Sequence, residues 1–133
     1  MQTKKEPYAT PEEYKKHVVH LDSLPKFKMA PPAENRIVSG ERITINFATV
    51  QPNSFFPVHR HEHEQIMMIM DGSSDWVVEG KLYHVEKGDV ITFPSNVEHG
   101  GYILDKGLTV IDVFSPARQD MIAKQREAMG KKG

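Results

Sequence analysis

The chain has 133 residues, which is enough for one domain with a sizeable hydrophobic core. Its formal net charge of −1 argues against a nucleic-acid surface, and the absence of Cys excludes disulfides, thiolate metal ligands and a cysteine nucleophile. No apolar stretch reaches membrane-spanning length and the N-terminus lacks the apolar core of a signal peptide, so we expect a cytoplasmic protein that acts without a membrane.

Residues 1–34 are expected to form an N-terminal arm with one short helix. The segment TPEE at 10–13 combines an N-cap residue, a proline at the first helical position and an acidic first turn, which predicts a helix to about His17. We expect residues 18–24 to be extended and the prolines that follow to bound an irregular loop.

Residues 35–115 show the pattern of a barrel of short strands. Glu41–Val50 alternates between an apolar face and a polar face, and the apolar face carries Ile43, Ile45 and Phe47. Further strands are expected at 75–78, 81–85, 90–93, 102–104 and 108–114, with turns at Asp71-Gly72, Glu79-Gly80, Gly88-Asp89 and Asp105-Lys106-Gly107. Many short, evenly spaced strands predict an all-β fold built as a small barrel.

The run that follows Gln65 is apolar at both parities. Strict alternation places Gln65 inward together with Met67 and Ile69. The outward row then consists of Ile66, Met68 and Met70. An outward apolar row needs a second buried surface, and because isologous contacts are the commonest closed assembly, we expect a homodimer.

The C-terminal segment is expected to be helical. Ser115-Pro116 repeats the cap-then-proline pattern, which predicts a helix over residues 116–130 with Gly130 as its stop. Its apolar stripe would consist of Ala117, Met121, Ile122 and Met129.

Four side chains have the spacing of a metal site. His59 and His61 lie two residues apart, so a strand would place both imidazoles on one face, and Gln65 follows four residues later. His99 arrives from a second segment, GDVITFPSNVEHG. This set of nitrogen and oxygen ligands suits one divalent transition metal ion, which could be Ni, Fe, Mn, Zn, Co or Cu.

Asp112 is a carboxylate in an apolar strand, TVIDVFSP. Burial there is costly unless the group is paired, and it raises the pKa of an unpaired carboxyl. If Val110, Asp112 and Phe114 face the interior, Asp112 lies beside the metal, where a buried carboxylate is a natural general acid or base. The alternative is a structural carboxylate bonded to loop amides or to Arg118.

The two segments together resemble the two-part motif of the cupin superfamily, G-x5-H-x-H-x3-E-x6-G and G-x5-P-x-G-x2-H. The departures are Gln65 in place of Glu, and Asn53 and Asn96 in place of Gly. Asn is among the few residues that tolerate a left-handed backbone, so both Asn replacements are mild. The resemblance implies a compact jelly-roll β-barrel with short N- and C-terminal helices, as a single domain over residues 1–133. It also implies that His63 lies in the turn after the ligands, as an outer-sphere or surface residue.

The segment from Asp112 to Arg118, DVFSPAR, narrows the resemblance when it is combined with H-x-H-x3-Q. Together they are similar to the pectin-degradation cupins that open the ring of 4,5-unsaturated uronates. That family implies His59, His61, Gln65 and His99 as metal ligands. It implies Asp112 as the proton-transfer residue, Phe114 as a pocket wall and Arg118 as a partner for the substrate carboxylate.

Three functions follow as hypotheses. The first is a metal-dependent isomerase or lyase that opens or tautomerises a small, hydroxylated, anionic substrate without redox chemistry. A neutral Gln65 favours it, because the ion keeps a net charge near +2 and acts as a better Lewis acid. The second is an iron-dependent dioxygenase or oxidase of a small organic substrate, and the third is a non-catalytic barrel that binds a sugar or another small molecule.

Overall fold

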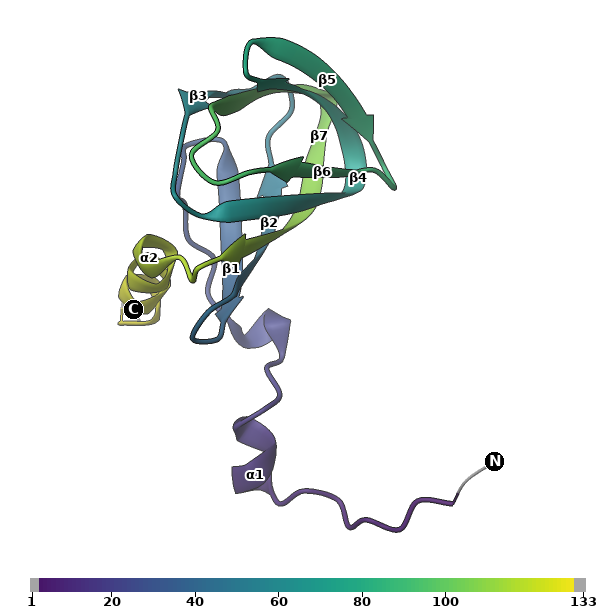
Figure 1. The fold of residues 1–133 in the computed structure, drawn as a ribbon. Helices are drawn as coiled ribbons and strands as arrows, with labels where there is room; N and C mark the ends of the chain where they lie inside the picture. The colour runs from purple at the N-terminus through teal and green to yellow at the C-terminus, as the bar shows by residue number, and fades with distance from the viewer. Residues whose placement is uncertain (1–2, 131–133) are drawn as a thin grey trace.

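The computed structural model describes residues 3–130, which form a curved antiparallel sheet with two short helices (Figure 1). The strands are β1 (Ala33–Ser39), β2 (Thr44–Val50), β3 (Phe55–His59), β4 (Glu64–Val78), β5 (Lys81–Glu86), β6 (Val90–Phe93) and β7 (His99–Ser115). The helices are α1 (Pro11–Lys15), the 3-10 turn η1 (Leu21–Ser23) and α2 (Gln119–Gly130). The expected all-β barrel with terminal helices is confirmed. No helix within residues 3–130 is both long and apolar enough to cross a membrane.

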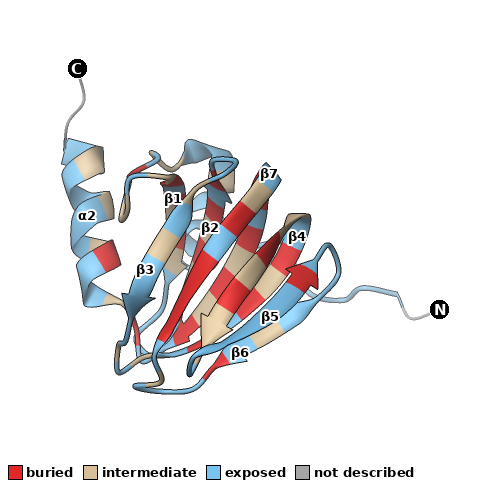
Figure 2. Ribbon diagram, turned by 90° about the horizontal axis from the view of Figure 1, so that it is seen from above, coloured by how far each residue is buried: buried red, intermediate tan, exposed pale blue. Residues whose placement is uncertain are grey.

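The sheet runs in the order β1-β2-β7-β4-β5, with β3 paired to β7 and β6 paired to β4. The two long strands β4 and β7 are its centre and pair with each other along most of their length. Buried positions recur along both strands, which marks the face that lines the barrel (Figure 2).

Two predicted turns are wrong, because both lie inside continuous strands. Asp71-Gly72 lies inside β4, between two points where the register of its pairing with β7 shifts. Residues 105–107 lie within β7. Gly72 and Gly107 have φ of 84° and 72°, and a Cβ on Gly72 would meet the carbonyl oxygen of Gly107. The glycines are therefore needed where two bent strands approach closely, and the chain continues past them.

The predicted inward face of β4 is confirmed, because Gln65, Met67 and Ile69 are all buried. On β2 the buried face is the one that carries Thr44 and Asn46, and the apolar row that includes Phe47 is only partly covered. The main core lies inside the barrel and consists of Ala33, Ala48, Val50, Met67, Ile69, Trp76, Val85, Phe93, Ile103, Leu108 and Val110. Full burial of a large side chain of this kind stabilises the fold by about 1.5–3 kcal/mol.

A second cluster attaches α2 to the barrel. Met121 packs with Phe27, Ile37 and Phe114. The side chain of Gln125 accepts from the backbone N–H of Ile37 at 2.8 Å and donates to its carbonyl at 3.0 Å. These two bonds pair the exposed edge of β1, so the helix covers that edge. The helix begins at Gln119, three residues after the predicted start, and its expected stripe residue Met129 is 49% exposed.

The N-terminal arm projects away from the barrel (Figure 1). Its helix has the predicted Thr10 cap, in a box where Thr10 and Glu13 each accept the other's backbone N–H, but it ends at Lys15 instead of His17. Residues 18–24 were expected to be extended, whereas η1 lies within them. No residue of α1 is buried, so this helix is not part of either core cluster, whereas Phe27, nearer the barrel, packs in the cluster that holds α2.

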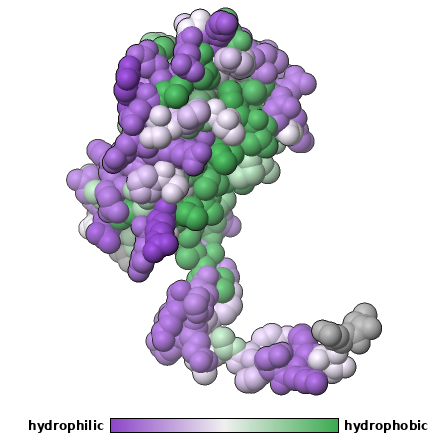
Figure 3. All heavy atoms as spheres, in the orientation of Figure 1, coloured by the Kyte–Doolittle hydropathy of each residue, from purple (hydrophilic) through white to green (hydrophobic). Residues whose placement is uncertain are grey.

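Apolar surface covers part of the barrel and continues to the base of the arm (Figure 3). The predicted outward row of β4 contributes to the exposed apolar side chains, with Ile66 39% and Met70 47% exposed. The homodimer stays a prediction, and this surface is where we expect its contacts.

Candidate metal centre

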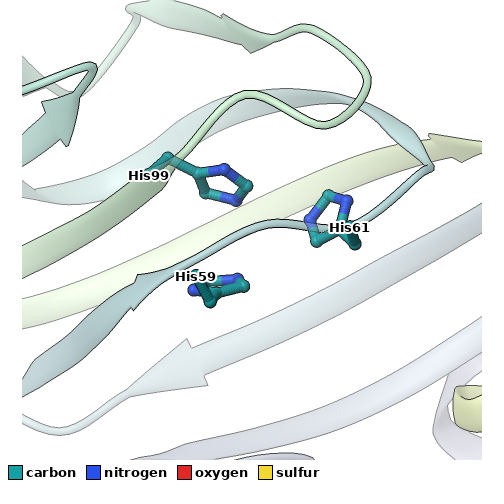
Figure 4. A group of neighbouring side chains, drawn as sticks. All are labelled: His59, His61 and His99. Atoms are coloured by element: carbon teal, nitrogen blue, oxygen red, sulfur yellow. The ribbon is translucent and has the colours of Figure 1, made fainter.

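Strand pairing brings three histidines together at one end of the barrel. His59 is the last residue of β3 and lies opposite His99, the first residue of β7. The two-residue spacing had indicated that His61 lies on the same strand as His59. In the structure β3 ends at His59, and His61 comes from the loop that follows. The side-chain nitrogens of these three residues lie within 4.8 Å of one another. The rings converge on a common point (Figure 4).

Backbone carbonyls set the tautomer of each ring. Nδ1 lies 2.9 Å from the carbonyl of Pro57 in His59, 2.8 Å from that of His63 in His61, and 2.9 Å from that of Val97 in His99. Because a carbonyl oxygen only accepts, each Nδ1 carries the proton. Each Nε2 therefore presents a lone pair, which is the arrangement of histidines that bind metals.

Burial keeps two of these imidazoles neutral. Desolvation is the main cause that lowers the pKa of His99 to about 4, and it also lowers the pKa of His61. Both rings are therefore unprotonated at neutral pH and available as ligands.

Gln65 presents an oxygen to the histidines. Its Nε2 donates to Oδ1 of Asp112 at 3.0 Å, which turns Oε1 toward Nε2 of His61 at 3.2 Å. Neither of these two facing atoms carries a proton when His61 is neutral, so their lone pairs repel. A cation bound between them removes the repulsion. The donor set, three imidazoles and one amide oxygen, thus fits a divalent transition metal.

Asp112 lies on β7 opposite Asn46 of β2, and its exposed fraction is 4%. It accepts from Gln65 Nε2 and from Asn46 Nδ2, each at 3.0 Å. Burial outweighs these two bonds and raises its pKa to about 6. The carboxylate is bonded to side-chain amides, and not to the loop amides or to Arg118 as the structural alternative had it. The sequence reasoning missed Asn46, whose only signal was its place on the polar face of β2.

Arg118 is held at the edge of the site. Its guanidinium lies 4.7 Å from the centre of the Phe114 ring, and Nε and Nη2 donate to Asp120 at 3.0 and 2.8 Å. Its backbone N–H donates to Oγ1 of Thr44 at 2.9 Å. The pairing lowers the pKa of Asp120 to about 2. Asp120 was also missed, because an acidic residue in the first turn of a helix has an ordinary explanation as a dipole partner.

The neighbouring residues divide into outward and inward groups. Arg60 points outward and pairs with Glu98. His63 is partly buried beside Phe114, and its Nδ1 has no hydrogen-bond partner among residues 3–130. Trp76 is buried, stacks on Phe56 and donates to Ser74 at 2.8 Å.

A cavity of about 350 Å³ opens beside the histidines. Asp112, Phe114 and Arg118 all line it, with Gln65. Its walls differ in character. One wall is polar and carries Asn35, Asn46, Gln65, Asp112 and Arg118; the other is apolar and includes Ala33, Ala48, Val50, Trp76, Leu108 and Val110.

Comparison with known proteins identifies the family. The family model described as Cupin domain matches residues 46–114. The chain belongs to the cupin family. This cupin is 37% identical over 65 residues to the pectin degradation protein KdgF of Dickeya dadantii (strain 3937), a match that covers 48% of this chain and 59% of that relative. The chain therefore matches less than two thirds of the relative's length.

Solved structures agree with this family. The structure of KdgF from Halomonas sp. is 26% identical, has a TM-score of 0.69 and matches 75% of this cupin and 93% of its own chain. An RmlC-like cupin from Shewanella frigidimarina is 23% identical over 79% of this chain and 95% of its own, with a TM-score of 0.73, and shows the fold alone. The expected resemblance to pectin-degradation cupins is confirmed in the sense that this is a KdgF-like cupin.

The departures from the cupin motif have the backbone that was expected of them. Asn53 and Asn96 have φ of 56° and 62°, so each occupies the left-handed conformation for which Gly is usual. Gln65 is the departure that changes the donor set of this cupin, because an amide oxygen stands where the motif has a carboxylate.

Proposed function

We propose that this chain is a metal-dependent enzyme that opens the ring of a small, hydroxylated, anionic substrate, of the class of 4,5-unsaturated monouronates. We also propose that residues 1–133 belong to one cupin domain, of which the family model matches residues 46–114. The observation that carries the proposal is the convergence of three imidazole lone pairs and the Gln65 oxygen beside the buried Asp112. The KdgF relatives support the substrate class.

His59, His61, Gln65 and His99 would hold the metal. When bound, a divalent ion supplies Lewis-acid polarisation of a substrate oxygen. Gln65 brings no charge to the site, so the ion's positive charge is not reduced by its amide ligand.

Asp112 would move the proton. With a pKa of about 6, it is mostly ionised at neutral pH and acts as a base. It removes the proton of the C1 hydroxyl, C1 becomes an aldehyde as the bond from C1 to the ring oxygen breaks, and the electron pair stays on that oxygen as a C5 enolate. Return of the proton to C4 gives the linear keto acid. Nothing is oxidised or lost, so the reaction is an isomerisation.

Arg118 would orient the substrate carboxylate. A guanidinium fork binds a planar carboxylate in two places, and the stacking on Phe114 and the pair with Asp120 fix its plane. Part of that fork is used by Asp120, so the remaining N–H donors would face the substrate. The apolar wall suits the C–H face and the double bond of an unsaturated ring, which has fewer hydroxyls than a saturated sugar.

The test is turnover of an unsaturated monouronate by metal-loaded protein. Ring opening removes the conjugated double bond, so ultraviolet absorbance falls with time. We expect the wild type to exceed the spontaneous rate and Asp112→Asn to return to it. A wild-type rate equal to the spontaneous rate would refute the proposal.

The second candidate is an iron-dependent dioxygenase of a small organic substrate. The three-imidazole cluster favours it as well, because imidazole ligands also suit iron. Oxygen uptake on addition of substrate separates the two, since the ring-opening isomerase consumes none.

A further inference from the structure

A row of polar side chains crosses four neighbouring strands and ends at the metal centre. Asn35 on β1, Asn46 on β2, Asp112 on β7 and Gln65 on β4 each contribute one inward side chain, in the strand order β1-β2-β7-β4. None of the four is more than 6% exposed. Asn46 lies directly opposite Asp112 in the strand register. We refer to these four residues as the amide row.

The hydrogen bonds of the amide row run in one sense toward Asp112. The backbone N–H of Met29 donates to Asn35 Oδ1 at 3.3 Å, and Asn35 Nδ2 donates to Asn46 Oδ1 at 3.0 Å. Asn46 Nδ2 then donates to Asp112 Oδ2 at 3.0 Å. Since the first donor is a backbone amide, neither Asn can reverse its side-chain amide without losing a bond. Asn46 therefore presents a donor, and not an acceptor, to the carboxylate.

The last bond of the row orients Gln65. Gln65 Nε2 donates to the other oxygen of Asp112, so the carboxylate is held between two amides from opposite sides. The carboxylate of Asp112 accepts a hydrogen bond from Gln65 only while the Gln65 amide points its Nε2 toward Asp112. That orientation is the one which presents Oε1 to His61.

We propose that Asn46 is a positioning residue, which fixes the carboxylate of Asp112 and, through it, the orientation of the Gln65 amide that ligates the metal. The proposal rests on the proposed function only in taking the three histidines and Gln65 as the metal site. Asn35 holds Asn46, and the Met29 backbone sets the sense of the whole row.

The experiment measures metal affinity in the absence of substrate. Asn46→Leu keeps a similar size but removes the donor to Asp112. Nickel titration of metal-free protein by calorimetry should show affinity about 10- to 100-fold weaker, the range found for outer partners of metal ligands. The matched control is Thr49→Val, an exposed position on the same strand, which should stay within about twofold of the wild type. A nickel affinity of Asn46→Leu within about twofold of the wild-type affinity would overturn the proposal.

A double-mutant cycle separates positioning from a general loss of structure. With Asp112 replaced by Ala, Asn46 has no route to Gln65, so Asn46→Leu should then weaken nickel binding by less than about twofold. The same large loss in both backgrounds would overturn the proposal. Asn46→Val, smaller and suited to a strand, replaces the Leu variant if that one does not fold. If neither folds, the row serves folding and the proposal is wrong.

Kinetics provide a readout that a structural role would not move in the same way. With an unsaturated uronate, Asn46→Leu in metal-saturated protein should lower kcat more than it raises KM, because Asp112 is misplaced while Arg118 is not. A wild type that binds nickel but turns over no uronate would refute the proposed function, and the double-mutant cycle of nickel affinity would still test the role of Asn46. Full uronate turnover together with no loss of nickel affinity in Asn46→Leu would refute only the role of Asn46.

Discussion

The buried carboxyl of Asp112 predicts how the stability of the metal-free protein depends on pH. Its pKa is about 6 in the folded chain, against a usual value of 3.8. The folded state therefore binds the proton more tightly than the unfolded state does. This contribution to stability is fully present below pH 3.8 and is lost as pH rises through 6. The two pKa values differ by about two units, which corresponds to about 3 kcal/mol.

Comparison of the wild type with Asp112→Asn isolates that contribution, because the other groups titrate in both proteins. We expect the wild type to lose about 2 kcal/mol of unfolding free energy relative to the variant between pH 4 and pH 7. Above pH 7 the difference should be constant. Urea unfolding in the presence of a chelator at several pH values measures it. Parallel curves for the two proteins across this range would show that Asp112 is not perturbed, and would refute the burial argument.

Three other substitutions test separate parts of the account. Metal analysis should show that His99→Ala abolishes stoichiometric metal binding, whereas the control variant His84→Ala, on the exposed face of β5, binds metal as the wild type does. Gln65→Glu adds a negative charge, so we expect equal or tighter metal binding and turnover about tenfold lower, a change of about 1.4 kcal/mol in the barrier; faster oxygen uptake than the parent would contradict it. Met70→Lys places a charge in the outward apolar row, and light scattering should shift from dimer to monomer; a parent that is already monomeric at micromolar concentration contradicts the assembly prediction.

The parts of the structure that follow local rules were predictable from the sequence. Alternation correctly placed Gln65 inward on β4, because one face of that strand is buried and a slip of one residue would expose it. The Glu79-Gly80 hairpin was predictable because a glycine-containing pair stands between two alternating runs. In the structure both residues take positive φ, 49° and 82°, as a tight hairpin turn requires. The helix cap at Thr10 involves only a neighbouring turn.

The parts that depend on distant residues were not predictable. Gly72 and Gly107 have the composition of turns, but their role is a close approach between two strands that are far apart in sequence. Ser115-Pro116 has the cap-then-proline pattern of a helix start, but here Ser115 is the last residue of β7 and α2 begins only at Gln119. Asn46 gains its meaning only when β2 pairs with β7 and faces it with Asp112.

The candidate site shows the same division. Spacing and the resemblance to the two-part cupin motif grouped the three histidines, and the structure brings them together because His99 begins the strand that pairs with β3. The bonds that give the site its chemistry cross between strands, from Gln65 and Asn46 to Asp112. A single sequence carries no direct record of such pairs.

The most direct measurement is a proton NMR time course of an unsaturated monouronate with metal-loaded protein in D2O under anaerobic conditions. The account predicts a linear keto acid, formed faster than the spontaneous reaction and at the same rate with or without oxygen. The product should carry deuterium at C4, because the last step returns a solvent-exchanged proton to that carbon. A product that requires oxygen, or a rate no faster than that of chelator-treated protein, would contradict metal-dependent isomerisation.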